Sequence, residues 1–99
     1  MLVIINDQTL DHSNDKTVLQ SIVQIVKQGH PHLIIDLSNI RMISSLGLAV
    51  LTNILRECNA HNGSLKVIKV PKDVEEMIKL TQLDRIISIY ANLEDALNQ

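Results

Sequence analysis

The sequence predicts an α/β fold with one mostly parallel sheet packed against helices, in the order β(β)αβαβαβα. Extended runs alternate with amphipathic helical runs along the chain. The run Leu33-Ile34-Ile35 is apolar without interruption, as in a strand that is covered on both faces. Each later pair of extended runs is separated by a helical crossover, which is the connection that parallel strands need. With 99 residues, 45% of them hydrophobic, we expect a single domain over residues 1–99.

The first half of the chain predicts a strand with a short hairpin arm, then a helix, then the central strand. Leu2 to Asn6 is β-rich, and Gln8 to Leu10 is expected to pair with it as a hairpin arm, which would make the sheet mixed at its first strand. A helix capped by Asp15 follows and ends at Gly29. His32 to Leu37 then predicts the buried central strand.

The second half repeats the alternation. A helix is predicted from Ser45 or Leu46 to Asn59, then a strand within Ser64 to Val70, a helix that begins at Pro71, and a short strand at Ile86 to Tyr90. The helix after Pro71 is expected to bury Val74, Met77, Ile78 and Leu80. A terminal helix carries Leu93, Ala96 and Leu97 on one face.

Composition argues against several classes of protein. A net charge of −2 gives no electrostatic attraction for nucleic acid, and Tyr90 as the only aromatic residue provides no platform for stacking bases. The three glycines form no phosphate-binding loop motif, and no cofactor is predicted. No apolar run reaches the roughly 20 residues of a membrane span, and no export signal follows Met1. We therefore expect a cytoplasmic protein without membrane insertion.

Groups with catalytic chemistry are scattered in a way that argues against an enzyme. The histidines His12, His30, His32 and His61 have no metal-ligand spacing, so no metal site is predicted. The acidic pairs Glu75-Glu76 and Glu94-Asp95 splay apart on a helix. Cys58 lies inside an apolar helical pattern with no histidine near it in sequence, which is typical of a buried free thiol. No catalytic residue is assigned.

Ser44 and Ser45 stand where strand-like sequence changes to an apolar helical run. One explanation is helix capping, because the first N–H groups of a helix have no partners within it. The other is a phosphate-accepting switch, since the same N–H groups and the positive end of the helix dipole can hold a phosphate. The residues alone leave both explanations open.

The segment "IIDLSNIRMISSLGLAVL", residues 34–51, resembles the anti-sigma factor antagonists of the STAS domain family. Asp36-Leu37-Ser38 matches the end of the family's strand, and Ser44-Ser45-Leu46-Gly47-Leu48 matches the start of its helix. The resemblance extends more loosely to Thr9-Leu10-Asp11 and to residues 63–90. It implies a STAS-like single domain.

The resemblance implies that Ser45, two residues before Gly47, takes the place of the family's phosphorylated serine. Ser44 stands where many members have Asp. Leu46 replaces a small residue, so it is either an exposed contact for a partner or part of the core. The residues expected at the partner-binding surface are Asp11, Asp36, Ser38, Ser44, Leu46 and Gly47, although Asp11, Asp36 and Ser38 could equally serve a turn or a cap.

The implied function is transcription regulation by partner switching in a bacterial signalling system. The unphosphorylated protein would bind an anti-sigma factor serine kinase, phosphorylation of Ser45 would release it, and a PP2C-type phosphatase would restore binding. ATP and Mg²⁺ would belong to the kinase. The alternative is a binding module without phosphorylation, such as the STAS subunit of a lipid-transport ABC complex or of a signalling assembly.

Overall fold

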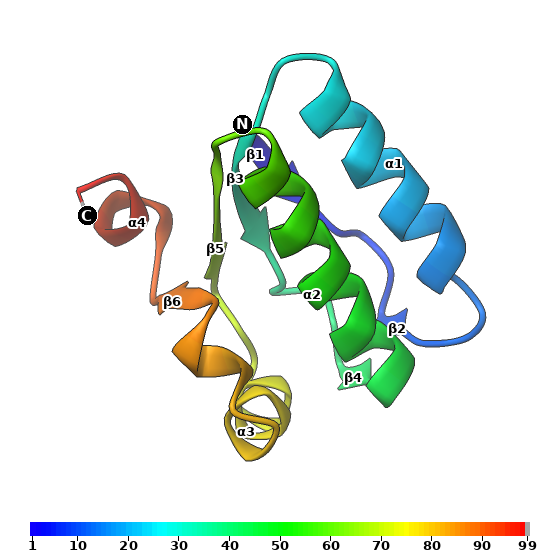
Figure 1. Cartoon of the computed structure of the whole chain (residues 1–99). Coiled ribbons are helices and arrows are strands. Elements are labelled where there is room, and N and C mark those ends of the chain that lie inside the picture. The colour runs from blue at the N-terminus through cyan, green and yellow to red at the C-terminus, as the bar shows by residue number, and fades with distance from the viewer. Residues whose placement is uncertain (99) are drawn as a thin grey trace.

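The computed structural model describes residues 1–98 and places four strands in one parallel sheet (Figure 1). The sheet order is β1 (Leu2–Ile4), β3 (His32–Asp36), β5 (Ser64–Ile68), β6 (Ser88–Tyr90). Leu2 pairs with Ile34 and Leu33 pairs with Leu65, so the central strand is held on both sides. Successive crossovers step in one direction across the sheet, which favours placing their helices on one face. The predicted α/β fold with a mostly parallel sheet packed against helices is confirmed.

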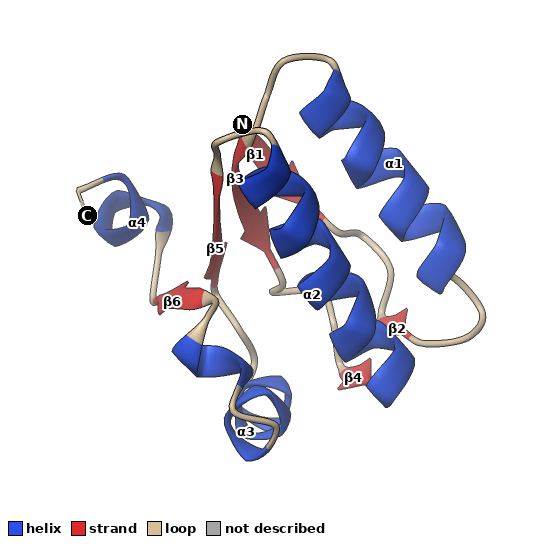
Figure 2. Ribbon diagram, viewed as in Figure 1, coloured by secondary structure: helices blue, strands red, loops and turns tan. Residues whose placement is uncertain are grey.

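Two long helices, α1 (Asp15–Lys27) and α2 (Ser45–Ala60), lie side by side over one face of the sheet (Figure 2). The helix α3 (Lys72–Leu80) packs against β4 (Met42–Ile43) and a 3₁₀ turn, η1 (Leu83–Arg85). The short α4 (Leu93–Leu97) packs against β5 and β6. Because β4 directly precedes α2 in the chain, the N-terminus of α2 lies beside β4.

The predicted hairpin is wrong, because Gln8 to Leu10 does not pair with the first strand. β2 (Thr9–Leu10) instead pairs in parallel with β4, with Leu10 opposite Ile43, and the two form a separate small sheet. Leu10 is fully buried there, and the carbonyl of Gln8 accepts the N–H of Arg41 at 2.7 Å. The burial of Leu10 against β4 and α2 outweighs the local hairpin, and each strand pairing within residues 1–98 is parallel.

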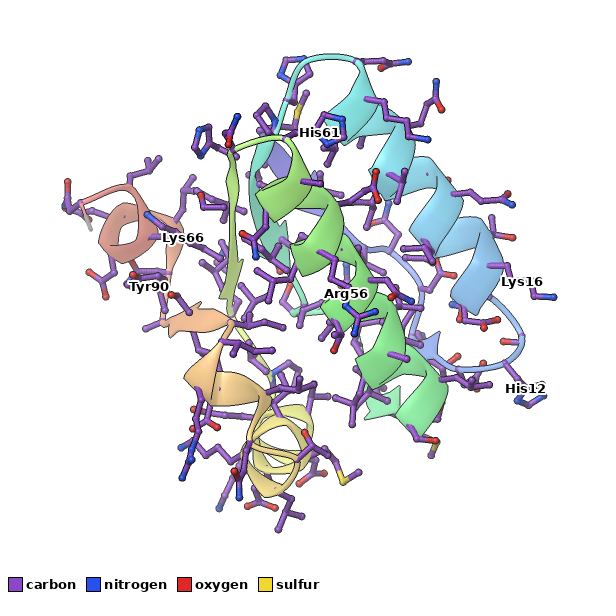
Figure 3. All side chains as sticks on the ribbon, viewed as in Figure 1. His12, Lys16, Arg56, His61, Lys66 and Tyr90 are labelled. Carbon is purple, nitrogen blue, oxygen red and sulfur yellow. The ribbon has the colours of Figure 1, made fainter. Side chains whose placement is uncertain are left out.

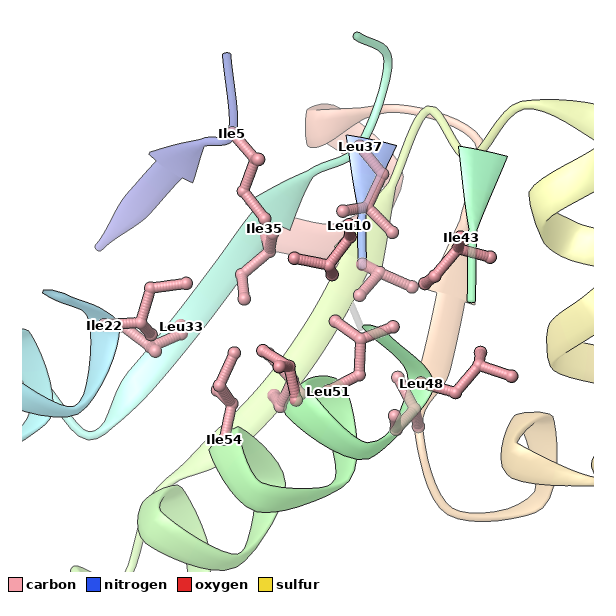
Figure 4. Packing of buried hydrophobic residues seen from close by; sticks show 14 of the residues in the cluster. Ile5, Leu10, Ile22, Leu33, Ile35, Leu37, Ile43, Leu48, Leu51 and Ile54 are labelled. Carbon is pink, nitrogen blue, oxygen red and sulfur yellow. The ribbon is translucent and has the colours of Figure 1, made fainter. Parts of the chain in front are cut away.

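The core joins the two sheets to α2. Figure 4 shows Leu10 and Ile43, from β2 and β4, above Leu48 and Leu51 of α2. These contacts belong to one continuous cluster that also includes Ile35 of the central strand. The first turns of α2 are therefore fixed by packing against the small β2–β4 sheet.

The helix after Pro71 buries less than the sequence predicts. Val74 and Ile78 are buried as expected, but Met77 is 37% exposed and Leu80 is 77% exposed. In a helix of nine residues, Val74 and Ile78 are spaced four apart and form a narrow stripe against β4 and η1. The prediction that Met77 and Leu80 are buried is wrong, because that stripe is too narrow to include them.

Candidate functional site

Ser44 is the residue that caps α2. Its backbone is extended, and its Oγ accepts the backbone N–H of Gly47 at 3.3 Å. Its own N–H donates to the carbonyl of Leu10 at 3.0 Å, which ties the cap to β2. Of the two explanations that the sequence left open, capping applies to Ser44.

Ser45 is the first residue of α2, and its side chain is exposed. Within residues 1–98 its hydroxyl makes no hydrogen bond, because Ser44 already serves as the cap. The first turn of α2 also contains no acidic residue. The hydroxyl of Ser45 is thus open to solvent at the positive end of a helix dipole.

Gly47 is buried where α2 crosses the end of β2. A Cβ at this position would collide with the carbonyl oxygen of Leu10 and would lie 2.7 Å from Cγ1 of Ile43. The missing side chain therefore allows the first turn of α2 to rest on the backbone of β2. Gly47 is therefore not exposed itself, but it allows the position of the first turn of α2 that carries Ser45.

Asp11 is the predicted acidic residue that lies next to this turn. It directly follows Leu10, whose carbonyl holds the N–H of Ser44. Its Oδ1 accepts the hydroxyl of Ser13 at 2.5 Å and the N–H of Ser13 at 2.9 Å. The hydroxyl bond, followed by the backbone bond, holds the pKa of the Asp11 carboxyl below its ordinary value. Asp11 therefore orders the loop beside the site.

Asp36 and Ser38 form a turn at the end of the central strand. Asp36 is 5% exposed, and its Oδ1 accepts the N–H of Ser38 at 2.8 Å. Its Oδ2 lies 3.9 Å from Nζ of Lys69. No hydrogen bond or ion pair within residues 1–98 joins Asp36 or Ser38 to the serine pair. Asp36 serves a turn here, whereas Ser38 is exposed, and a partner-binding role for either residue stays a prediction.

Apolar side chains are exposed close to Ser45 in sequence. Leu46 is 46% exposed, so it is not a core residue. Met42 on β4 is 64% exposed, while its neighbour Ile43 is buried. Met42 is not among the residues expected at the site from the sequence, although neighbouring residues of a strand point to opposite faces and Ile43 is apolar.

Groups with redox or ligand chemistry are scattered over the described residues, and of these His12 lies in the loop of Asp11. Burial raises the pKa of the Cys58 thiol, which keeps it protonated inside α2. Figure 3 shows His12 and His61 at opposite ends of the molecule. It also shows Lys66 close to Tyr90, with Nζ of Lys66 2.7 Å from the carbonyl oxygen of Ala96. In the described part of the chain, no three His, Cys, Asp or Glu residues are grouped as metal ligands would be.

No helix within residues 1–98 combines the length and the apolar character that crossing a bilayer requires.

Comparison with known proteins identifies a family and several relatives of this chain. The model of the STAS domain family matches residues 1–96. A Thermotoga maritima protein named "Putative anti-sigma factor antagonist" is 29% identical over 76 residues, which cover 77% of this chain and 67% of that protein. The anti-sigma F factor antagonist of Paenibacillus polymyxa is 24% identical over 99 residues, covering 100% of this chain and 85% of that protein.

A solved structure extends the agreement to three dimensions. The crystal structure of an anti-sigma factor antagonist from Mycobacterium paratuberculosis matches with a TM-score of 0.85 and 28% identity. The match covers 98% of this chain and 81% of the other. The fold and the sequence match together confirm the resemblance, and the chain belongs to the STAS domain family.

Proposed function

We propose that this STAS domain is an anti-sigma factor antagonist controlled by phosphorylation of Ser45. It binds an anti-sigma factor with serine-kinase activity while Ser45 is unmodified, and so regulates transcription indirectly in the cytoplasm. The kinase phosphorylates Ser45 and the complex separates, and a PP2C-type phosphatase then restores binding. Support comes from the family and from relatives that carry the name anti-sigma factor antagonist. In this cycle the domain is a binding protein and a substrate, and no catalytic group of its own takes part.

The exposed hydroxyl of Ser45 is the observation that carries this proposal. It stands on the first residue of α2, free of the capping role that Ser44 fills. A kinase can therefore reach the oxygen without opening the helix. A phosphate at this position would lie near the positive end of the helix dipole, and the first turn contains no acidic residue that would repel it. The domain is suited to remain folded in both states.

The switch itself is electrostatic. A phosphoserine carries a charge of about −1.5 to −2, which a partner covering Ser45 would have to strip of water. Burying an unmatched charge costs several kcal/mol. A penalty of about 3 to 4 kcal/mol would weaken the complex by hundreds of times, since each 1.4 kcal/mol is about a tenfold change. The same charge is tolerated when the surface is free.

The surface that we propose for the partner is centred on Ser45 and Leu46. Ser44 holds the turn through its cap, and Gly47 allows the turn to rest on β2. The loop of Asp11 flanks the turn because Leu10 is bonded to Ser44. Leu46 supplies an exposed apolar contact. Binding and phosphorylation therefore use the same small area.

Incubation with the cognate anti-sigma factor kinase and ATP tests this function. We expect one phosphate on Ser45, located by mass spectrometry, and release of the phosphorylated protein from the kinase in size-exclusion chromatography. Ser45→Ala should bind without being released, and a PP2C-type phosphatase should reverse the modification of the wild type. Phosphate confined to Ser44 would contradict the site. Stable binding with no phosphorylation would favour a STAS module of a transport or signalling assembly instead.

A further inference from the structure

β1 forms an edge of the four-stranded sheet, and its outer side is open. Within residues 1–98 the sheet ends at β1, and β3 is the only strand that pairs with it. A groove of about 240 Å³ lies between β1 and α1, so α1 does not cover this edge. The α1 side of the groove is lined by uncharged side chains, among them Thr17 and Ser21. A further strand therefore has room to approach β1.

The backbone of β1 presents hydrogen-bonding groups at this edge. The N–H of Ile5 donates to the carbonyl of Asp36 at 3.3 Å, and the carbonyl of Met1 accepts a bond from β3 at 3.0 Å. The backbone groups of successive residues in a strand alternate between its two sides. Leu2 and Ile4 therefore direct their N–H and C=O groups away from β3. Both residues can donate to a further strand and accept from it.

The side chains of this edge are apolar and carry no charge. Leu2 is 41% exposed and Ile4 is 50% exposed, whereas Val3 between them packs against the core. Natural edge strands are commonly protected from pairing by lysine, proline or a bulge, and the sequence Leu-Val-Ile of β1 contains neither of these residues. Asp7, the charged residue that lines the groove, lies beyond the C-terminal end of β1.

We propose that β1 pairs antiparallel with β1 of a second copy of this chain, across a two-fold axis at Val3. In this register Leu2 lies opposite Ile4 of the second copy, and the two residues exchange both of their backbone hydrogen bonds. The edge complements itself because Leu2 and Ile4 are placed symmetrically about Val3. Their exposed side chains contact each other across the pair. The two Asp7 carboxylates lie at opposite ends of the paired strands, so these like charges do not meet.

The contact is small and does not rest on the proposed function. A pair of three-residue strands is small against the roughly 1,200 Å² of a stable interface, so we expect a weak dimer with a dissociation constant of about 10 µM to 1 mM. Figure 1 shows β1 near the C-terminal end of α2, whereas the first turn of α2 lies beside β4. Pairing at β1 therefore joins two sheets into one without covering the serine pair.

Sedimentation velocity over a concentration series tests the self-association. Leu2→Lys combined with Ile4→Lys places like charges opposite each other in this register and should weaken the dimer at least about tenfold. Leu2→Glu combined with Ile4→Lys is the matched control, because it removes the same side chains but places opposite charges across the pair. This control should keep the dimer. Leu2 and Ile4 are exposed, so thermal unfolding of both double variants should be close to that of the wild type.

Engineered cysteines test the register independently. Val3→Cys places two thiols directly opposite each other at the two-fold axis, within reach of a disulfide, so air oxidation should yield a covalent dimer. Leu2→Cys is the control, because the two copies of this residue lie diagonally, about 7 to 8 Å apart, which is too far for a disulfide. The native Cys58 is buried and does not compete.

Two results would overturn this inference. The first is a wild type that stays monomeric up to about 1 mM. The second is a dimer that both double variants weaken equally and that Val3→Cys does not cross-link, because such a dimer forms through another surface. Neither result bears on phosphorylation of Ser45, so the proposed function stands or fails separately.

Discussion

The first turns of α2 and α3 differ in how their unpaired N–H groups and the positive end of the helix dipole are compensated. α3 begins after Pro71 without a side-chain cap, and its first turn contains Asp73 and Glu75. These carboxylates lie near the positive end of the α3 dipole and offset its partial charge. α2 has the opposite arrangement, with a serine cap and no acidic residue in its first turn. The dipole of α2 is therefore left without a counter-charge from its own first turn.

The difference in burial explains how α2 can dispense with that charge. Its buried residues include Leu48, Leu51 and Ile54, which pack into the main core, whereas α3 buries only Val74 and Ile78. Helical stability in proteins comes mainly from the packing of an apolar face. A helix that is stabilised by packing does not need a permanent counter-charge in its first turn, so its N-terminus can interact with an anion that is added and removed. The proposed switch therefore relies on a helix whose stability comes from its packed face.

Placing a permanent charge at the start of α2 should produce the largest effect. Ser45→Asp is expected to weaken binding to the anti-sigma factor kinase by up to hundreds of times, because the partner must bury the carboxylate. The variant should remain folded, since Asp is favourable in the first turn. Ser45→Asn has nearly the same size without the charge and is the matched control. Calorimetry that finds equal affinities for Asp and Asn would contradict an electrostatic switch.

A smaller effect should separate the two serines by their roles. Ser44→Ala removes the acceptor for the Gly47 N–H and is expected to lower the free energy of unfolding by about 1 kcal/mol. Ser45→Ala removes an exposed hydroxyl with no bond and should change stability by less than about 0.5 kcal/mol. Urea unfolding of both variants measures the difference. A larger loss for Ser45→Ala would mean that Ser45 is the functional cap.

Much of this arrangement could be predicted because it depends on local patterns. The periodicity of residues 45–59 predicts α2 to within a residue of its bounds, and the uninterrupted apolar run at Leu33 predicts the central strand. The identity of the cap was harder, because a serine pair offers two candidates and only the backbone position of Ser44 distinguishes them.

Features that depend on contacts between residues far apart in the chain could not be predicted from the sequence. β2 and β4 are two residues each, and they pair where Leu10 is buried beneath α2. Met77 is exposed because only a narrow stripe of α3 faces β4 and η1. The apolar pattern of α3 does not indicate the width of that stripe. The burial of the Asp36 carboxylate likewise depends on the sheet around it, and Lys69, which follows the neighbouring strand β5, lies 3.9 Å from Oδ2 of Asp36.

The smallest predicted effect compares the second residue of each helix, Leu46 in α2 and Asp73 in α3. Leu46→Glu should be more stable than Leu46→Gln by about 0.3 to 1 kcal/mol, because the new carboxylate supplies the counter-charge that α2 lacks. Asp73→Asn should lose a similar amount, because it removes such a charge from α3. Urea unfolding at low salt measures both differences, and 1 M NaCl should reduce them by screening. If Leu46→Glu gains nothing over Leu46→Gln at low salt, the start of α2 has no uncompensated charge, and the electrostatic contrast between the two helices is wrong.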